Sequence, residues 1–136
     1  MAHNPDILTP AAKDYNLDEL SSICRGDVEN MRRMLGVFVT QGWNTSTQLT
    51  VALEGGDTAT VLRLAHRLKS SLNYLAMHRL ISIIRTLEET CDPTELLSSQ
   101  HVSIANAIIG QLNATLQQLT TEFQLPDQQP AIPQNV

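Results

Sequence analysis

The sequence has 136 residues, the length of one domain, with a net charge of −5 and an apolar share of 42%. The acidic charge argues against a nucleic-acid-binding protein, which needs a basic surface to displace counterions from phosphates. No run approaches the roughly 18 apolar residues that cross a bilayer, and the N-terminus lacks a signal-peptide pattern. We therefore expect one cytoplasmic domain, with no nucleic acid and no membrane among its partners.

The two ends of the chain differ in composition from its body. Residues 1–15 contain Pro5 and Pro10, and we expect them to form an extended N-terminal arm. Residues 125–136 contain three prolines and four amide side chains. A segment of this composition cannot bury enough apolar surface to become ordered, so we expect a disordered tail. The predicted domain therefore covers residues 16–124.

Two glycine–aspartate pairs divide this body into helices. At Gly26-Asp27 and Gly56-Asp57, the glycine suits the end of one helix, and the aspartate can accept the free N–H groups that begin the next. The apolar spacing then predicts a short helix and four long ones. Their expected ranges are Leu17 to Cys24, from Asp27 to about Ala52, Asp57 to Leu75, Met77 to Cys91 and His101 to Phe123. Short connections between long helices predict an all-α, up-down four-helix bundle with a short additional N-terminal helix.

Each long helix has a predicted buried side. On the first, apolar or small residues recur at alternating spacings of three and four: Val28, Met31, Leu35, Phe38, Gly42, Thr45, Leu49 and Ala52. On the second, the buried set is Val61, Leu64, Ala65, Leu68, Leu72 and Leu75. On the third it is Leu80, Ile83, Ile84 and Leu87, and on the fourth it is Ile104, Ile108, Leu112, Leu116, Leu119 and Phe123.

His66 is the candidate reactive residue. It lies roughly 150° from the centre of the buried stripe of its helix, so we expect its imidazole to face solvent. Lys69 follows by one helical turn, so its ammonium can reach a group attached to the imidazole. A neutral imidazole is a nucleophile toward activated phosphorus, and phosphoryl transfer needs mainly positioning and positive charge. An isolated histidine and lysine at this spacing are usually ordinary surface residues. The surrounding sequence therefore has to show whether the pair is a reactive site.

That context resembles a known family. The segment Leu-Ala-His-Arg-Leu-Lys-Ser-Ser from Leu64, followed by Leu75-Ala76 and Leu87-Glu88, resembles the A-H-x-L-K-G-S motif of histidine-containing phosphotransfer (HPt) domains. Upstream, similar landmarks occur in the same order: Leu20, Gly26-Asp27, Met34-Leu35, Phe38, Ala52 and Gly56-Asp57. The resemblance spans Tyr15 to Glu89.

The resemblance implies a phosphorelay intermediate. His66 would accept a phosphoryl group from the aspartyl phosphate of a receiver domain and pass it to another receiver, with Lys69 steadying the phosphoryl oxygens. Glu88 holds the position, 22 residues after the histidine, that contacts the imidazole in many members; here it is either an orienting group or a plain surface charge. Ser70 and Ala76 stand where the family usually has glycine, and we expect phosphoryl transfer to be retained at a lower rate. Ser70 is either a passive surface residue or a donor to the phosphoryl group.

The resemblance also implies the partners, which are response-regulator receiver domains and a hybrid histidine kinase. We expect the chain to be a monomer that docks receivers through a small apolar patch including Leu62, with Arg63 and Asn73 at its edge. We expect Mg²⁺ on the receiver and no cofactor on this chain. An autokinase is not expected, because no Gly-rich nucleotide loop occurs. The alternative is an interaction protein of the same shape that binds receivers without being phosphorylated.

We expect no metal site. His78, His101, Cys24 and Cys91 lack the spacing of metal ligands, and we expect both cysteines to be reduced and half-buried.

Overall fold

A computed structural model describes residues 14–126. Five helices occupy this part of the chain: α2 (Asp18–Ile23), α3 (Val28–Glu54), α4 (Thr58–Tyr74), α5 (His78–Thr90) and α6 (Ser99–Glu122). The described residues contain no strand. The predicted all-α class is confirmed, and each predicted helix is present within two residues of its expected ends.

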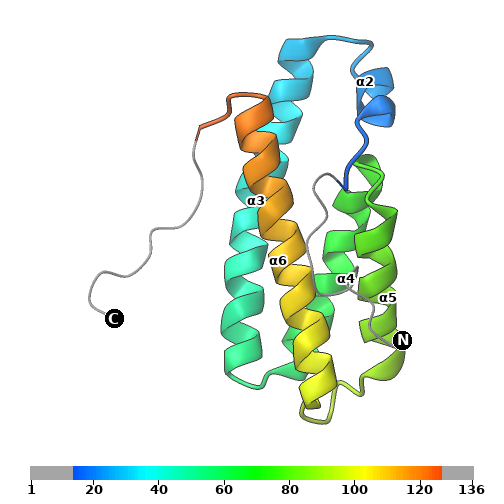
Figure 1. Ribbon diagram of the computed structural model, residues 1–136, viewed down its shortest axis with the longest axis vertical. Helices are drawn as coiled ribbons and strands as arrows, with labels where there is room; N and C mark the ends of the chain where they lie inside the picture. The colour runs from blue at the N-terminus through cyan, green and yellow to red at the C-terminus, as the bar shows by residue number, and fades with distance from the viewer. Residues whose placement is uncertain (1–13, 127–136) are drawn as a thin grey trace, which may run out of the picture.

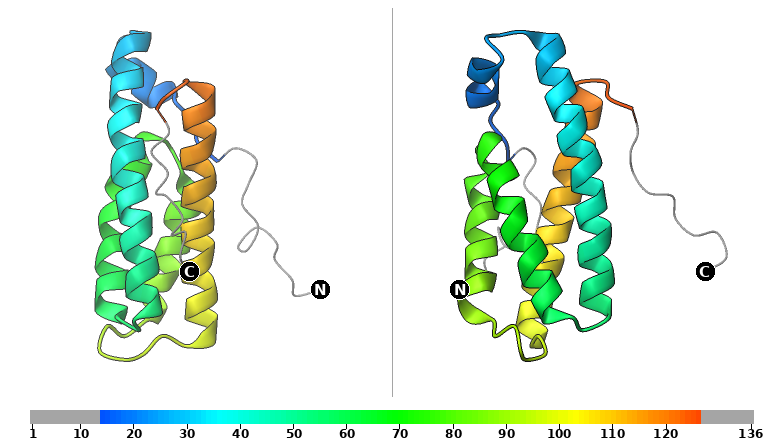
Figure 2. Two further views of the ribbon diagram at one scale, coloured as in Figure 1. Left: turned by 90° about the vertical axis from the view of Figure 1, so that its left-hand side faces the viewer. Right: turned by 180° about the vertical axis from the view of Figure 1, so that it is seen from behind.

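The four long helices form a closed up-down bundle (Figure 1). α3 packs against α4 and α6, and α5 packs against the same two helices. The short α2 packs against α3 at one end of the bundle, and the loop from α5 to α6 crosses the other end (Figure 2). The predicted architecture is therefore confirmed, including the additional short helix.

The predicted helix starts have their expected caps. The side chain of Asp27 accepts a hydrogen bond from the Asn30 amide, and that of Asp57 accepts one from the Thr60 amide. Ser98 caps α6 in the same way by accepting a bond from the His101 amide. These polar groups satisfy N–H groups that have no partner within the helix.

The core lies along the axis of the bundle and is built mainly from leucine and isoleucine. Its largest fully buried side chains come from all four long helices and include Leu35, Leu72, Leu80, Ile84, Leu112 and Leu116. The predicted buried sets of α4 and α5 are confirmed in full.

The predicted buried side of α3 is partly wrong. Val28 is 61% exposed, and Phe38 and Thr45 are only half-buried, whereas Val39 and Trp43 are buried. The rest of the predicted stripe, Met31, Leu35, Gly42, Leu49 and Ala52, is buried, so its spacing is correct along the helix. Val28 is the first residue of α3, and Val39 and Trp43 each lie one position after a predicted residue; packing against α4 and α6 decides which of two adjacent positions is buried.

On α6 two predicted core residues, Ile104 and Phe123, are half-buried. Two polar residues, Gln111 and Thr115, are buried instead. Both cysteines are free, but Cys24 is buried rather than half-buried.

Two residues at the edges of the predicted domain pack into its core. Tyr15 and Leu125 are buried in the core, and the Tyr15 hydroxyl donates to the Glu122 carboxylate. The packed core therefore includes one residue of the predicted arm and one of the predicted tail. Residues 1–13 of the arm and 127–136 of the tail lie outside the described residues.

The connection from α4 to α5 is tight and places these helices side by side. Ala76 has a φ of +52°, the left-handed conformation that glycine adopts without strain. The amide of Met77 donates back to the carbonyl of Leu72 and closes the end of α4. The chain thus reverses direction in few residues, which sets the register of α4 against α5.

Candidate functional site

The site is built on the side of α4 that faces α5. The buried residues Val61, Leu64, Ala65, Leu68 and Leu72 fix the rotation of α4. His66 lies away from this stripe, and its side chain is 68% exposed, as predicted. A partner can therefore reach the imidazole without any opening of the bundle.

Glu88 on α5 joins His66 and Lys69 in one hydrogen-bonded group. Its Oε2 lies 2.6 Å from Nδ1 of His66, and its Oε1 accepts a bond of 2.6 Å from Nζ of Lys69. The side chains of Lys69 and Glu88 are only 20% and 23% exposed. The structure thus places the Glu88 carboxylate in contact with both the imidazole and the ammonium.

Glu88 is ionised in this arrangement. Partial burial raises its pKa, but hydrogen bonds from Lys69 and His66 outweigh that effect and hold the pKa below the ordinary value. An ionised carboxylate only accepts hydrogen bonds, so Nδ1 must carry the proton in the short contact with His66. The ring is then fixed in its Nδ1–H form.

The opposite ring nitrogen is available for chemistry. No hydrogen-bond partner from residues 14–126 occupies Nε2 of His66, and in the neutral Nδ1–H ring this atom carries the lone pair. The arrangement therefore presents an oriented nitrogen nucleophile, a carboxylate behind it and an ammonium one helical turn away.

The other predicted site residues lie on the same side of α4 without joining this group. The Ser70 hydroxyl donates to the backbone carbonyl of Arg67 at 3.2 Å. Arg63 and Asn73 are exposed, and Leu62 is half-buried against the edge of the core. Leu62 therefore offers only part of its side chain to a partner.

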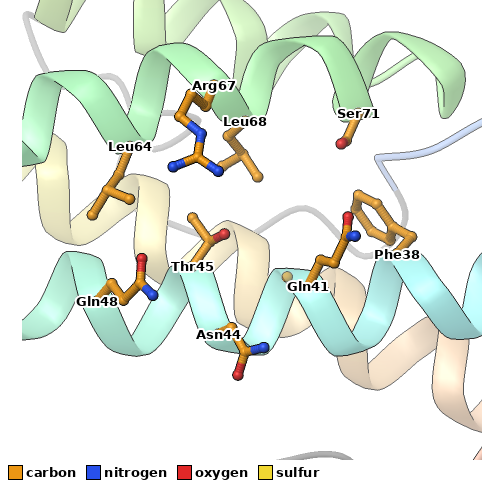
Figure 3. Close-up of a pocket in the computed structure, with 10 residues that line it drawn as sticks. Phe38, Gln41, Asn44, Thr45, Gln48, Leu64, Arg67, Leu68 and Ser71 are labelled. Carbon is orange, nitrogen blue, oxygen red and sulfur yellow. The ribbon is translucent and has the colours of Figure 1, made fainter.

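The sequence analysis missed a groove between α3 and α4. Figure 3 shows Arg67 reaching from α4 toward Thr45 on α3, with the amide side chains of Gln41 and Gln48 nearby. The groove has a volume of about 330 Å³. The polar residues Gln41, Asn44, Thr45 and Gln48 follow one another at helical spacing, which was the available signal. The groove is lined by residues of α3 and α4, and His66, Lys69 and Glu88 are not among them.

A smaller and more apolar groove continues toward α2. It is lined in part by Met34, Val37 and Tyr74, three large side chains that are exposed. The predicted periodicity gave no indication of this surface, because exposure of apolar residues depends on which helices pack beside them.

Neither a metal centre nor a membrane segment is found in the part of the chain that the structure describes. Residues 14–126 contain no group of three or more metal-ligating side chains, and none of their helices is long and apolar enough to span a membrane.

Comparison with family models assigns the chain to a protein family. The family model of the Hpt domain matches residues 33–122, which include α4, α5 and the His66–Glu88–Lys69 group. Comparisons with curated proteins and with solved structures each gave no match. Hpt domains carry phosphoryl groups on histidine in phosphorelay signalling, are not kinases and interact with receiver domains. The match covers about two thirds of the sequence, and the chain therefore belongs to the Hpt domain family.

Proposed function

We propose that this chain is the intermediate of a phosphorelay and carries the phosphoryl group on Nε2 of His66. It accepts the group from the aspartyl phosphate of one receiver domain and delivers it to the aspartate of another. The observation that carries this proposal is the hydrogen bond between Nδ1 of His66 and Glu88, which leaves Nε2 exposed as the nucleophile.

Lys69 supplies positive charge to the reaction. Before phosphorylation its ammonium is bound to Glu88, one helical turn from the imidazole. When a phosphoryl group arrives on His66, the same ammonium can turn toward its oxygens, since a lysine side chain has several rotatable bonds. Positive charge at the equatorial oxygens lowers the barrier of phosphoryl transfer.

The metal ion of the reaction belongs, in this proposal, to the partner. Phosphoryl transfer commonly uses Mg²⁺ to neutralise developing charge. His66 is accompanied by one carboxylate, that of Glu88, and by an ammonium that competes for it. We therefore expect Mg²⁺ to be held by the receiver, together with its aspartate.

The experiment is a phosphotransfer profile with the purified chain. Each receiver domain of the host genome is phosphorylated, mixed with the chain in Mg²⁺, and followed by transfer of radioactive label. Wild type should gain acid-labile, alkali-stable label, and His66→Gln should gain none. His78→Gln is the matched control, because His78 is also exposed but lies at the start of α5.

Two outcomes would overturn the proposal. Label that persists in His66→Gln would assign the chemistry to another residue. Stable binding of receivers with no label in wild type would instead support an interaction protein that keeps the bundle without its chemistry.

A further inference from the structure

Among residues 14–126, two neighbouring helices have long segments without charged side chains. The sequence has nine Lys and Arg and fourteen Asp and Glu residues, and none of them lies in residues 34–53 of α3 or 99–121 of α6. We propose that a second copy of this chain binds to the surface that these two segments share, so that two copies form a back-to-back dimer. The inference goes beyond the proposed function and does not depend on it.

The two uncharged segments form one continuous surface, because α3 and α6 pack against each other (Figure 2). The hydroxyl of Ser46 on α3 donates to Oδ1 of Asn113 on α6 at 2.5 Å. A Cβ atom at Gly42 on α3 would lie only 2.6 Å from Cδ2 of Leu116 on α6, so the two backbones are close. We call the exposed and half-buried residues beside this contact the α3–α6 surface; it includes Thr40, Thr47, Thr50, Asn106, Asn113 and Thr120.

Helical spacing places these residues together. Thr40 and Thr47 are seven residues apart on α3, and so are Asn106, Asn113 and Thr120 on α6. Seven residues are close to two turns of an α-helix, so each set lies on one side of its helix. Because Asn113 bonds to α3, the set on α6 lies on the side nearest α3.

The threonines of this surface would lose no hydrogen bond if water were excluded from it. The hydroxyls of Thr40, Thr47, Thr50 and Thr120 each donate to the carbonyl four residues earlier in their own helix, at 2.8 to 3.0 Å. A hydroxyl that bonds its own helix keeps its partner on burial, and its methyl group remains for contact. Covering these threonines therefore costs little in desolvation.

A second copy is the partner that an uncharged surface suits. In a two-fold dimer the same surface lies on both sides of the interface, so a charge near the axis would face an identical charge. The centres of interfaces are depleted of charged residues, because charges are costly to bury. His101, the titratable residue of the α6 segment, bonds through Nε2 to Thr90 on α5 and so faces another helix. Two copies can therefore meet here without burying or opposing charges.

The α3–α6 surface is large enough for a weak but specific dimer. At about 1.5 Å per residue, residues 34–53 extend about 30 Å, and two adjacent helices are about 20 Å wide. About 600 Å² of each copy would be covered, or about 1,200 Å² in total, which is the lower limit for specific interfaces. We therefore expect association in the micromolar range and not a permanent dimer.

Such a dimer would leave both copies of His66 open. α4 and α5 pack against each other on the side of the bundle away from the pair of α3 and α6 (Figure 1). The side chain of His66 on α4 is 68% exposed, and its contact, Glu88, is on α5. Association through α3 and α6 therefore does not cover the phosphoryl site of either copy.

The test measures the mass of the full-length chain by sedimentation equilibrium, without any receiver. The mass should rise from 15.0 kDa toward twice that value between about 1 µM and 1 mM, the range in which a modest interface is half occupied. Thr47→Lys and Asn106→Lys should each weaken association by at least about tenfold, because like charges then face each other. The matched control is Thr86→Lys on α5, an exposed threonine whose hydroxyl also donates to the carbonyl four residues earlier.

Two further measurements need no substitution at the surface. Added salt should strengthen association slightly, since it screens the repulsion between two chains of net charge −5 and no ion pair is lost. In ¹H–¹⁵N NMR spectra, the resonances that shift with concentration should belong to α3 and α6. Circular dichroism melts of the lysine variants show whether the bundle is intact.

The inference is wrong if wild type keeps the mass of one copy at every concentration, which is the monomer expected from the sequence. It is equally wrong if both lysine variants associate like wild type, or if Thr86→Lys weakens association as much as they do. Concentration-dependent shifts confined to α4 and α5 would place the contact elsewhere and would also overturn it. Failure of the proposed relay function would be seen separately, as absence of transfer from receivers.

Discussion

Replacing Lys69 by alanine separates chemistry from folding at this site. The side chain lies outside the buried stripe of α4, and its described interaction is the hydrogen bond to Glu88. Alanine favours helix, so the backbone of α4 is retained. The substitution therefore removes one ammonium and leaves the bundle in place.

The expected effect on stability is small. Ion pairs near the surface are typically worth up to about 1 kcal/mol, and the lysine stem, whose side chain is only 20% exposed, adds some lost packing. For a domain of this size, such a loss lowers the melting temperature by roughly 5 °C or less. Helical circular dichroism should be unchanged.

The expected effect on phosphoryl transfer is larger, for two reasons. The transferring group loses a nearby positive charge, and the Glu88 carboxylate loses the partner that offsets its repulsion. We expect transfer to slow by at least about tenfold, or roughly 1.4 kcal/mol in barrier height.

The assay is rapid-quench transfer of label from a phosphorylated receiver to the chain, with thermal melts on the same samples. Lys69→Arg, which keeps the charge, should recover part of the rate. Arg85→Ala is the matched control, because it removes an exposed positive charge from α5, one turn before Glu88. Transfer at the wild-type rate in Lys69→Ala would refute the assigned role.

Three further predictions concern docking, the turn and acid stability. Leu62→Asp should slow transfer from receivers and cost about 1 kcal/mol without unfolding the bundle, since Leu62 is half-buried; titration of binding would show an unchanged affinity if docking occurs elsewhere. Ala76→Gly should raise the unfolding free energy by about 1 kcal/mol or less in urea melts, because it relieves a left-handed φ of +52°; a decrease would contradict this explanation. The pKa of Glu88 is lowered in the folded protein, so its ionised carboxylate stabilises the fold above the ordinary pKa of 4.5, and this stabilisation is lost as pH falls through the folded pKa. The difference in unfolding free energy between wild type and Glu88→Gln should therefore shrink in acid. A difference that stays constant with pH would argue against the ion pair.

Local patterns in the sequence determined the helices and the candidate nucleophile. Helix ends depend on nearby caps, so Asp27 and Asp57 could be recognised in the sequence. The rotation of α4 follows from one dominant apolar stripe, which placed His66 on the exposed side. Lys69 was found because neighbours on a helix are separated by three or four residues.

The tertiary structure decided what lies across from each helix. Glu88 is 22 residues from His66, and their contact depends on the tight turn at Ala76 and on the register of α5 against α4. No local pattern distinguishes that contact from an exposed carboxylate. The same limit applies to α3, where packing against α4 and α6 buried Trp43 and left Val28, the first residue of the helix, exposed. The pairing of His66 with Lys69 follows from their separation in the sequence, because both lie on one helix. The contact of Glu88 with His66 depends on how two helices pack against each other.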